Sequence, residues 1–98
     1  MNKEFWFDLQ SLFIERWDKC YFCDVSPRFK ELWSGSLEFV RECFELAKQF
    51  VRENNIEVEN DTDNLFEIPP WHEGWGEWMN KMREIRLNFL DWVINKSE

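Results

Sequence analysis

Residues 26 to 55 read SPRFKELWSGSLEFVRECFELAKQFVRENN, and this stretch decides the fold class. Ser26-Pro27 marks a helix start, because a serine side chain caps a helix N-terminus and proline is tolerated at the first helical position. The short helix that begins there stops at Gly35, and Ser36 caps a longer helix that Asn54-Asn55 ends. The longer helix has apolar residues at steps of three and four, as a core-facing stripe requires: Leu37, Val40, Phe44, Ala47 and Val51.

The same spacing predicts a long helix on each side of this stretch. The first helix is capped by Asn2, and its apolar positions are Phe5, Trp6, Leu9, Leu12, Phe13, Trp17, Cys20 and Tyr21. The last helix begins near Gly76-Glu77, and its apolar face contains Trp78, Met82, Ile85, Phe89, Trp92 and Val93. Three bases of this last helix are expected to point away from the core: Lys81, Arg83 and Arg86.

The expected fold is therefore all-α, or mainly α, with a single domain over residues 1–98: a small bundle of three long helices and one short helix. Residues 56 to 70 lose the helical period. Short apolar-polar alternations in this acidic segment surround a polar turn, and they fit either a small hairpin or an extended loop. Pro69-Pro70 closes the segment before the last helix.

The composition indicates a globular, cytoplasmic protein. Apolar residues make up 44% of the chain and include ten Phe and seven Trp, which is ample material for a core. No stretch has the eighteen or more apolar residues that a transmembrane helix needs, and the N-terminus lacks the basic start and apolar run of a signal peptide. The three cysteines are an odd number, which fits reduced thiols better than a disulfide framework.

The net charge of −8 is concentrated in one part of the chain. Residues Glu53 to Glu77 contain eight acids and no Lys or Arg, whereas the rest of the chain contains twelve acids and twelve bases. A localised negative field repels nucleic acid and anionic membranes, and it attracts basic proteins. We therefore expect a basic protein partner and neither nucleic-acid nor membrane binding.

Cys20-Tyr21-Phe22-Cys23 has the spacing of redox and zinc motifs. A redox pair needs its attacking cysteine at a helix N-terminus, where the dipole stabilises the thiolate, but this motif is expected at the end of a helix. Zinc needs four ligands, and only Cys43 and His72 remain as candidates, without a second paired motif. Two core cysteines and one turn cysteine are the favoured interpretation, with no metal site.

Catalysis and calcium binding have weaker support. His72 precedes Glu73, but no nucleophile, glycine-rich phosphate loop or Ser/His/Asp order accompanies this pair, so we expect no enzyme activity and no cofactor. An EF-hand loop needs Gly at its sixth position and Glu at its twelfth. Frames that begin at Glu57 or Glu59 have neither residue in place.

Tryptophans follow the acidic segment among prolines and glycines. Trp78 belongs to the apolar face of the last helix, whereas Trp71 and Trp75 are candidates for interface anchors, a role in which Trp is enriched. The alternatives are that these rings cap the open end of the bundle and that the acids only solvate a loop. The predicted partner-binding residues are Glu57, Glu59, Asp61, Asp63, Glu67, Trp71, Glu73, Trp75 and Glu77.

In general character, the chain resembles the small acidic helical immunity proteins that bacteria make against their own nuclease toxins. The shared features are length, helical content, and an acidic segment followed by aromatic residues: Glu57, Glu59, Asp61, Asp63 and Glu67, then Trp71 and Trp75. The resemblance implies an inhibitor that docks on the active or substrate-binding surface of a basic toxin. Two other interpretations stay open: a phage-encoded inhibitor of a host defence nuclease, and a helical adaptor that binds through an apolar groove.

Overall fold

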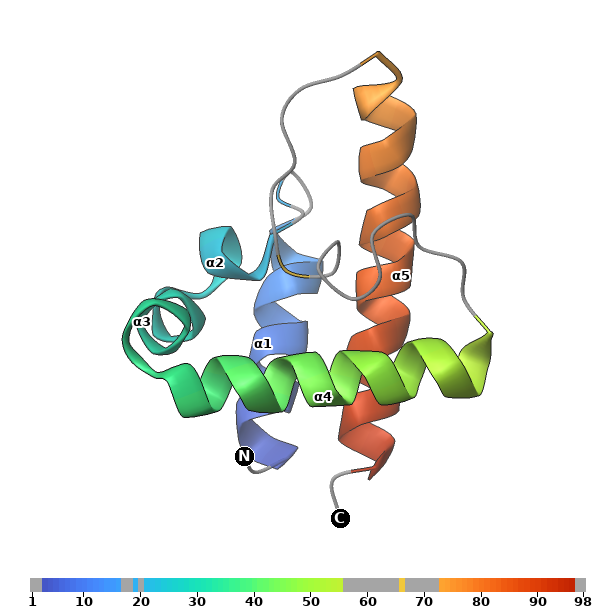
Figure 1. The fold of residues 1–98 in the computed structure, drawn as a ribbon. Helices are drawn as coiled ribbons and strands as arrows, with labels where there is room; N and C mark the ends of the chain where they lie inside the picture. The colour runs from blue at the N-terminus through green and yellow to red at the C-terminus, as the bar shows by residue number, and fades with distance from the viewer. Residues whose placement is uncertain (1–2, 17–18, 20, 56–65, 67–72, 97–98) are drawn as a thin grey trace.

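The computed structural model describes residues 3–16, 19, 21–55, 66 and 73–96. These residues form five helices: α1 (Lys3–Glu15), α2 (Phe22–Val25), α3 (Pro27–Gly35), α4 (Leu37–Asn54) and α5 (Trp75–Lys96). α1 and α5 pack side by side and run in opposite directions, α4 lies across them, and α2 and α3 form one end of the molecule (Figure 1). The predicted all-α bundle is confirmed, with one short helix more than expected.

Side-chain caps start α3 and α4 where the sequence predicted. The Oγ atoms of Ser26 and Ser36 accept hydrogen bonds from the backbone N–H groups of Phe29 (3.1 Å) and Phe39 (3.2 Å). A serine cap of this kind contributes about 1 kcal/mol. The C-terminus of α4 is capped by Asn55, whose φ of 52° lies in the left-handed region and whose N–H donates to the carbonyl of Val51. Asparagine adopts this conformation more readily than most residues.

The first helix is shorter than predicted. α1 ends at Glu15 instead of continuing to Tyr21, and Phe22 to Val25 form the separate helix α2. The physical reason lies on α5, because Arg83 donates hydrogen bonds to the carbonyl groups of Phe13 (2.8 Å) and Lys19. The Phe13 carbonyl would otherwise be satisfied by a continuing helix. Arg83 therefore donates the hydrogen bond that the next turn of α1 would have donated to the Phe13 carbonyl.

The buried stripe of α4 is also displaced from the predicted one. The helix buries Phe39, Cys43, Ala47 and Phe50. Leu37, which was expected in the core, is 66% exposed, whereas Phe44 and Val51 are partly buried at the edge of the core. The two stripes share Ala47. The observed stripe faces the core because its phenylalanines pack against aromatic rings of α1, α3 and α5. Aromatic pairs of this kind add to the stability that area burial alone provides.

Phe66 is the described residue that anchors the segment between α4 and α5. Its side chain is buried, and its ring lies 5.1–6.4 Å from five other aromatic rings: Phe22, Phe29, Trp33, Phe44 and Phe89. These rings belong to α2, α3, α4 and α5. An apolar residue from the acidic segment therefore completes the core. The choice between hairpin and loop falls outside the described residues.

We predict that Phe66→Ala destabilises the protein by about 3–5 kcal/mol, because the substitution leaves a cavity among five packed rings. Leu37→Ala is the matched control, because it removes an apolar side chain that is mostly exposed, and it should cost less than about 1 kcal/mol. Urea unfolding followed by circular dichroism measures both. Equal losses for the two variants would contradict this account of the core.

Candidate functional site

The arginines of α5 do not point away from the core, and this prediction was wrong. Arg83 is 7% exposed and Arg86 is fully buried. The guanidinium of Arg83 stacks over the Phe13 ring at 4.4 Å, and that of Arg86 lies over the rings of Tyr21 (4.8 Å) and Trp78 (5.7 Å). Arginine tolerates such sites because its planar guanidinium is weakly hydrated and stacks on aromatic rings. Of the three bases in question, only Lys81 is exposed.

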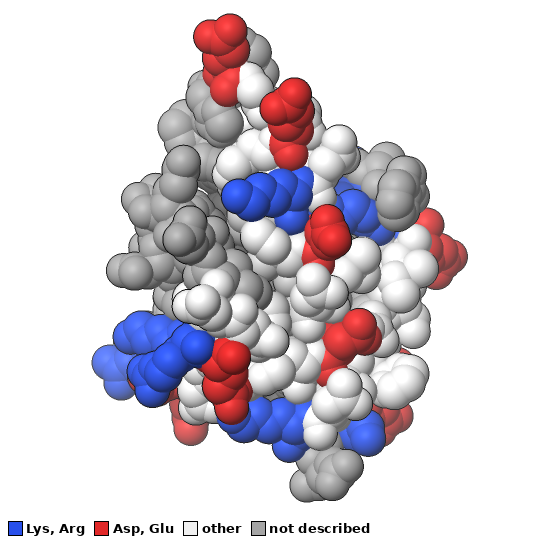
Figure 2. Space-filling model, turned by 90° about the vertical axis from the view of Figure 1, so that its right-hand side faces the viewer, with Lys and Arg blue, Asp and Glu red and all other residues white. Residues whose placement is uncertain are grey.

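The burial of these arginines leaves an acidic line on the outer side of α5. Glu77, Glu84 and Asp91 are exposed and follow one another at intervals of seven residues, which is close to two helical turns. Glu73, just ahead of the helix, is exposed as well. Figure 2 shows acidic side chains one above another along this side of the molecule, with basic side chains among them. On α5 itself, Lys81 is the exposed base between Glu77 and Asp91. Counting charges along the sequence did not show that the acidic line continues to Asp91, because the count includes Arg83 and Arg86, which are buried.

Exposed apolar side chains of α1 lie beside the acidic line. Phe7 and Ile14 are 51% and 56% exposed. Between them, the side-chain amide of Gln10 donates a hydrogen bond to the carboxylate of Asp91, which places this side of α1 next to α5. Residues three and four apart share one side of a helix, so Phe7 and Ile14 flank Gln10. We call the acidic line of Glu73, Glu77, Glu84 and Asp91, together with Phe7 and Ile14, the acidic face.

The predicted binding residues that the structure describes lie at the start of α5. Glu73 and Glu77 are exposed. Trp75 is half-buried, and its ring stacks on Trp78 with centroids 5.3 Å apart. Gly74 precedes it with a φ of 84°, a conformation that favours glycine, and accepts a hydrogen bond from the N–H of Trp78 (3.0 Å). The other predicted residues lie outside the described part of the chain: Glu57, Glu59, Asp61, Asp63, Glu67 and Trp71.

Glu53, at the other end of the acidic stretch, is separated from this face. Its carboxylate lies 3.6 Å from the ammonium of Lys96, and both side chains are about half exposed. The same ammonium donates to Gln49 (2.8 Å) and lies 4.6 Å from the centre of the Trp92 ring. Exposed pairs of this kind contribute little stability. The nearby cation nevertheless weakens the field of Glu53.

The described cysteines are free thiols. Cys23 is half-buried on α2, and Cys43 is buried on α4. The expectation that the Cys-x-x-Cys motif ends a helix was wrong for Cys23, but burial and the neighbouring Asp24 raise its pKa. Burial raises the pKa of Cys43 even further. Both thiols are therefore poor nucleophiles. Among the described residues, no group of three or more His, Cys, Asp and Glu side chains could hold a metal ion.

No family model, curated protein or solved structure matches this chain. The resemblance to bacterial immunity proteins stays a hypothesis that depends on charge, size and helical content. No helix in the described part of the chain is long and apolar enough to cross a bilayer.

We predict that Arg83→Met destabilises the protein by about 1–3 kcal/mol, because the carbonyl groups of Phe13 and Lys19 lose a buried donor. Lys81→Met is the control on the same helix, since it removes an exposed cation, and it should change stability by less than about 0.5 kcal/mol. Chemical unfolding curves give both values. Equal stability of the two variants would show that the buried guanidinium does not hold the end of α1.

A second prediction concerns the thiol of Cys43. Because its pKa is raised in the folded protein, the neutral thiol stabilises the fold below the ordinary cysteine pKa of 9.0, and this contribution is lost as the pH rises above that value. The unfolding free energy of the wild type should therefore fall more steeply above pH 9 than that of Cys43→Ala, by at most about 1.4 kcal/mol per pH unit. If the unfolding free energies of the wild type and Cys43→Ala fall equally with pH, the pKa of Cys43 is not raised in the folded protein.

Proposed function

We propose that this chain is a non-enzymatic, protein-binding inhibitor that covers a basic surface of its partner. The single observation that carries the proposal is the acidic face, where exposed carboxylates of α5 lie beside exposed apolar side chains of α1. Carboxylates that pair with Lys and Arg accelerate association with a basic protein. Desolvated apolar side chains at the centre of an interface slow its dissociation.

The carboxylates are held on a rigid frame. Glu77, Glu84 and Asp91 belong to one helix, so they repeat at intervals of about 10 Å along its axis. The buried arginines tie this helix to the carbonyl groups and rings beneath it. Little conformational entropy is then lost when a partner binds. A basic surface with cations at matching intervals, such as a nucleic-acid-binding groove, is complementary to this pattern.

The finer proposal is that the partner is a nuclease-type toxin and that the chain is a bacterial immunity protein acting in the cytoplasm. In this proposal the carboxylates take the positions of nucleic-acid phosphates, and Glu57, Glu59, Asp61, Asp63, Glu67, Trp71 and Trp75 extend the contact. A phage-encoded inhibitor of a host defence nuclease would use the same surface. A helical adaptor is supported by the exposure of Phe7 and Ile14 alone and would need little electrostatic attraction.

The test compares two triple variants that remove the same number and kind of charges. Glu77→Gln/Glu84→Gln/Asp91→Asn neutralises the three acids that α5 contributes to the acidic face, and Asp24→Asn/Glu31→Gln/Glu45→Gln neutralises exposed acids on α2, α3 and α4. The partner is first captured from host extract and then purified. Association kinetics at several salt concentrations and inhibition of nuclease activity are measured for each variant.

We expect the first variant to associate about tenfold more slowly, with a weaker dependence on salt, and the control variant to stay close to the wild type. Phe7→Ser/Ile14→Ser should instead accelerate dissociation. Equal effects of the two triple variants would show that only net charge matters. Loss of binding in the apolar variant alone, without salt dependence, would favour the adaptor.

A further inference from the structure

A hollow of about 350 Å³ lies between α1, α3 and the first turns of α4, apart from the acidic face. Its apolar part is formed by Phe5, Leu32 and Phe39. The rings of Phe5 and Phe39 are packed edge to face with centroids 5.8 Å apart. Pockets of this volume are at the lower end of the range for small-molecule sites. Three helices therefore border an open hollow with room for a small organic ligand.

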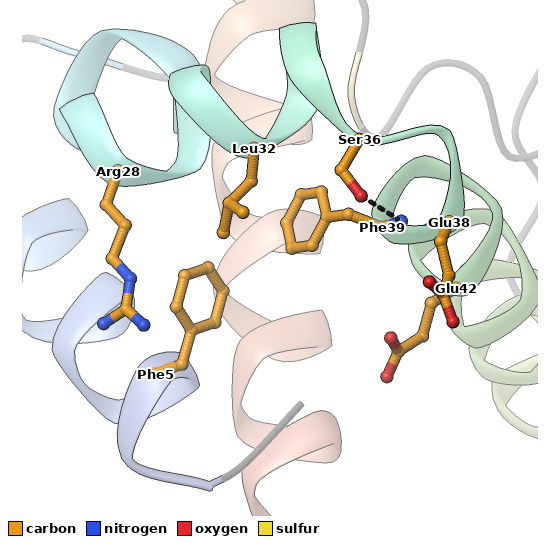
Figure 3. A pocket seen from close by; sticks show the side chains of 7 residues that line it. All are labelled: Phe5, Arg28, Leu32, Ser36, Glu38, Phe39 and Glu42. Atoms are coloured by element: carbon orange, nitrogen blue, oxygen red, sulfur yellow. Dashed lines mark hydrogen bonds between the residues drawn. The ribbon is translucent and has the colours of Figure 1, made fainter.

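The charged residues of this hollow are segregated by sign. Arg28, on the first turn of α3, lies with its guanidinium 5.3 Å from the centre of the Phe5 ring. Glu38 and Glu42 are one turn apart on α4. Figure 3 shows Arg28 at one end, the two carboxylates at the opposite end, and the apolar side chains between them. The hollow thus has a cationic end, an apolar middle and an anionic end.

Both ends are carried by helices with defined starts. The Ser36 hydroxyl accepts a hydrogen bond from the N–H of Phe39, and this cap fixes the turn from which Glu38 projects (Figure 3). Ser26 caps the helix that carries Arg28 in the same way. The rings of Phe5 and Phe39, which form the bottom of the hollow, belong to the buried core. The separation between the charges is therefore set mainly by packed helices, with some freedom left in the two exposed side chains.

We propose that this hollow binds a small zwitterion whose carboxylate and ammonium groups are separated by an apolar chain. The carboxylate would pair with Arg28, the ammonium with Glu38, and the apolar chain would cover the rings of Phe5 and Phe39. A simple anion can pair with Arg28 alone and a simple cation with Glu38 alone, whereas a zwitterion can pair with both. This site is independent of the proposed inhibitor function, because it uses none of the residues of the acidic face.

The test uses three ligands of equal chain length: 6-aminohexanoate, hexanoate and hexylamine. Each is titrated into isotopically labelled protein, and NMR shifts at Phe5, Leu32 and Phe39 report binding. We expect 6-aminohexanoate to bind about fivefold tighter than either singly charged ligand, as one additional solvent-accessible ion pair allows. A series from 4-aminobutanoate to 8-aminooctanoate then measures the span between the charges as an affinity maximum.

Variants assign the two ends. Arg28→Gln should remove the advantage of 6-aminohexanoate over hexylamine, and Glu38→Gln should remove its advantage over hexanoate. Lys30→Gln and Glu31→Gln are the matched controls, because they change neighbouring exposed charges of α3 that do not line the hollow, and they should keep both advantages.

The proposal is overturned if the zwitterion binds the wild type no tighter than hexanoate and hexylamine. It is also overturned if the lining variants behave like their controls, or if the shifts fall outside the hollow. The comparison of ligands on the wild type does not depend on the folding of any variant. A negative result here leaves the inhibitor proposal intact, because that proposal is tested by different variants and a protein partner.

Discussion

The hydrogen bonds of the buried Arg83 guanidinium to the end of α1 are the interaction on which the rest of the structure depends. Burying a cation is costly unless hydrogen bonds replace its hydration, and here the carbonyl groups of Phe13 and Lys19 accept them. The same contacts end α1, allow α2 to form separately and hold α1 against α5. They also remove a positive charge from the outer side of α5. One side chain therefore links the path of the chain to the electrostatic character of its surface.

Local signals were sufficient to predict the helices but not how each helix is rotated. Serine caps, Pro27 and the left-handed Asn55 depend only on neighbouring residues, and the structure has α3 and α4 where those residues place them. The core stripe of α4 was predicted one position away because two overlapping stripes are both apolar, and only rings from other helices decide between them. Phe66 was not recognised as a core residue, because it lies in a short apolar-polar alternation, Leu65-Phe66-Glu67-Ile68, outside any helical stripe.

The candidate site was predictable only in part for a related reason. The exposure of Glu73 and Glu77 follows from their positions in a charged, glycine-rich entry to a helix. The continuation through Glu84 and Asp91 could not be read from charge counting, since Arg83 and Arg86 balance these acids in the sequence but lie inside the fold. The periodicity of α5 did not reveal the burial of the arginines either, because most of their partners are carbonyl groups and rings of residues 13 to 21.

The pairing of α1 with α5 has a consequence for biosynthesis. These two helices are separated by about sixty residues of intervening chain, yet each covers apolar residues of the other. A ribosome that has completed α1 must still synthesise residues 75–96 before Trp6 can pack on Phe89 and Arg83 can reach the Phe13 carbonyl. During that interval the first helix exposes aromatic surface of the kind that chaperones recognise. The nascent chain therefore depends on its last helix to become resistant to aggregation.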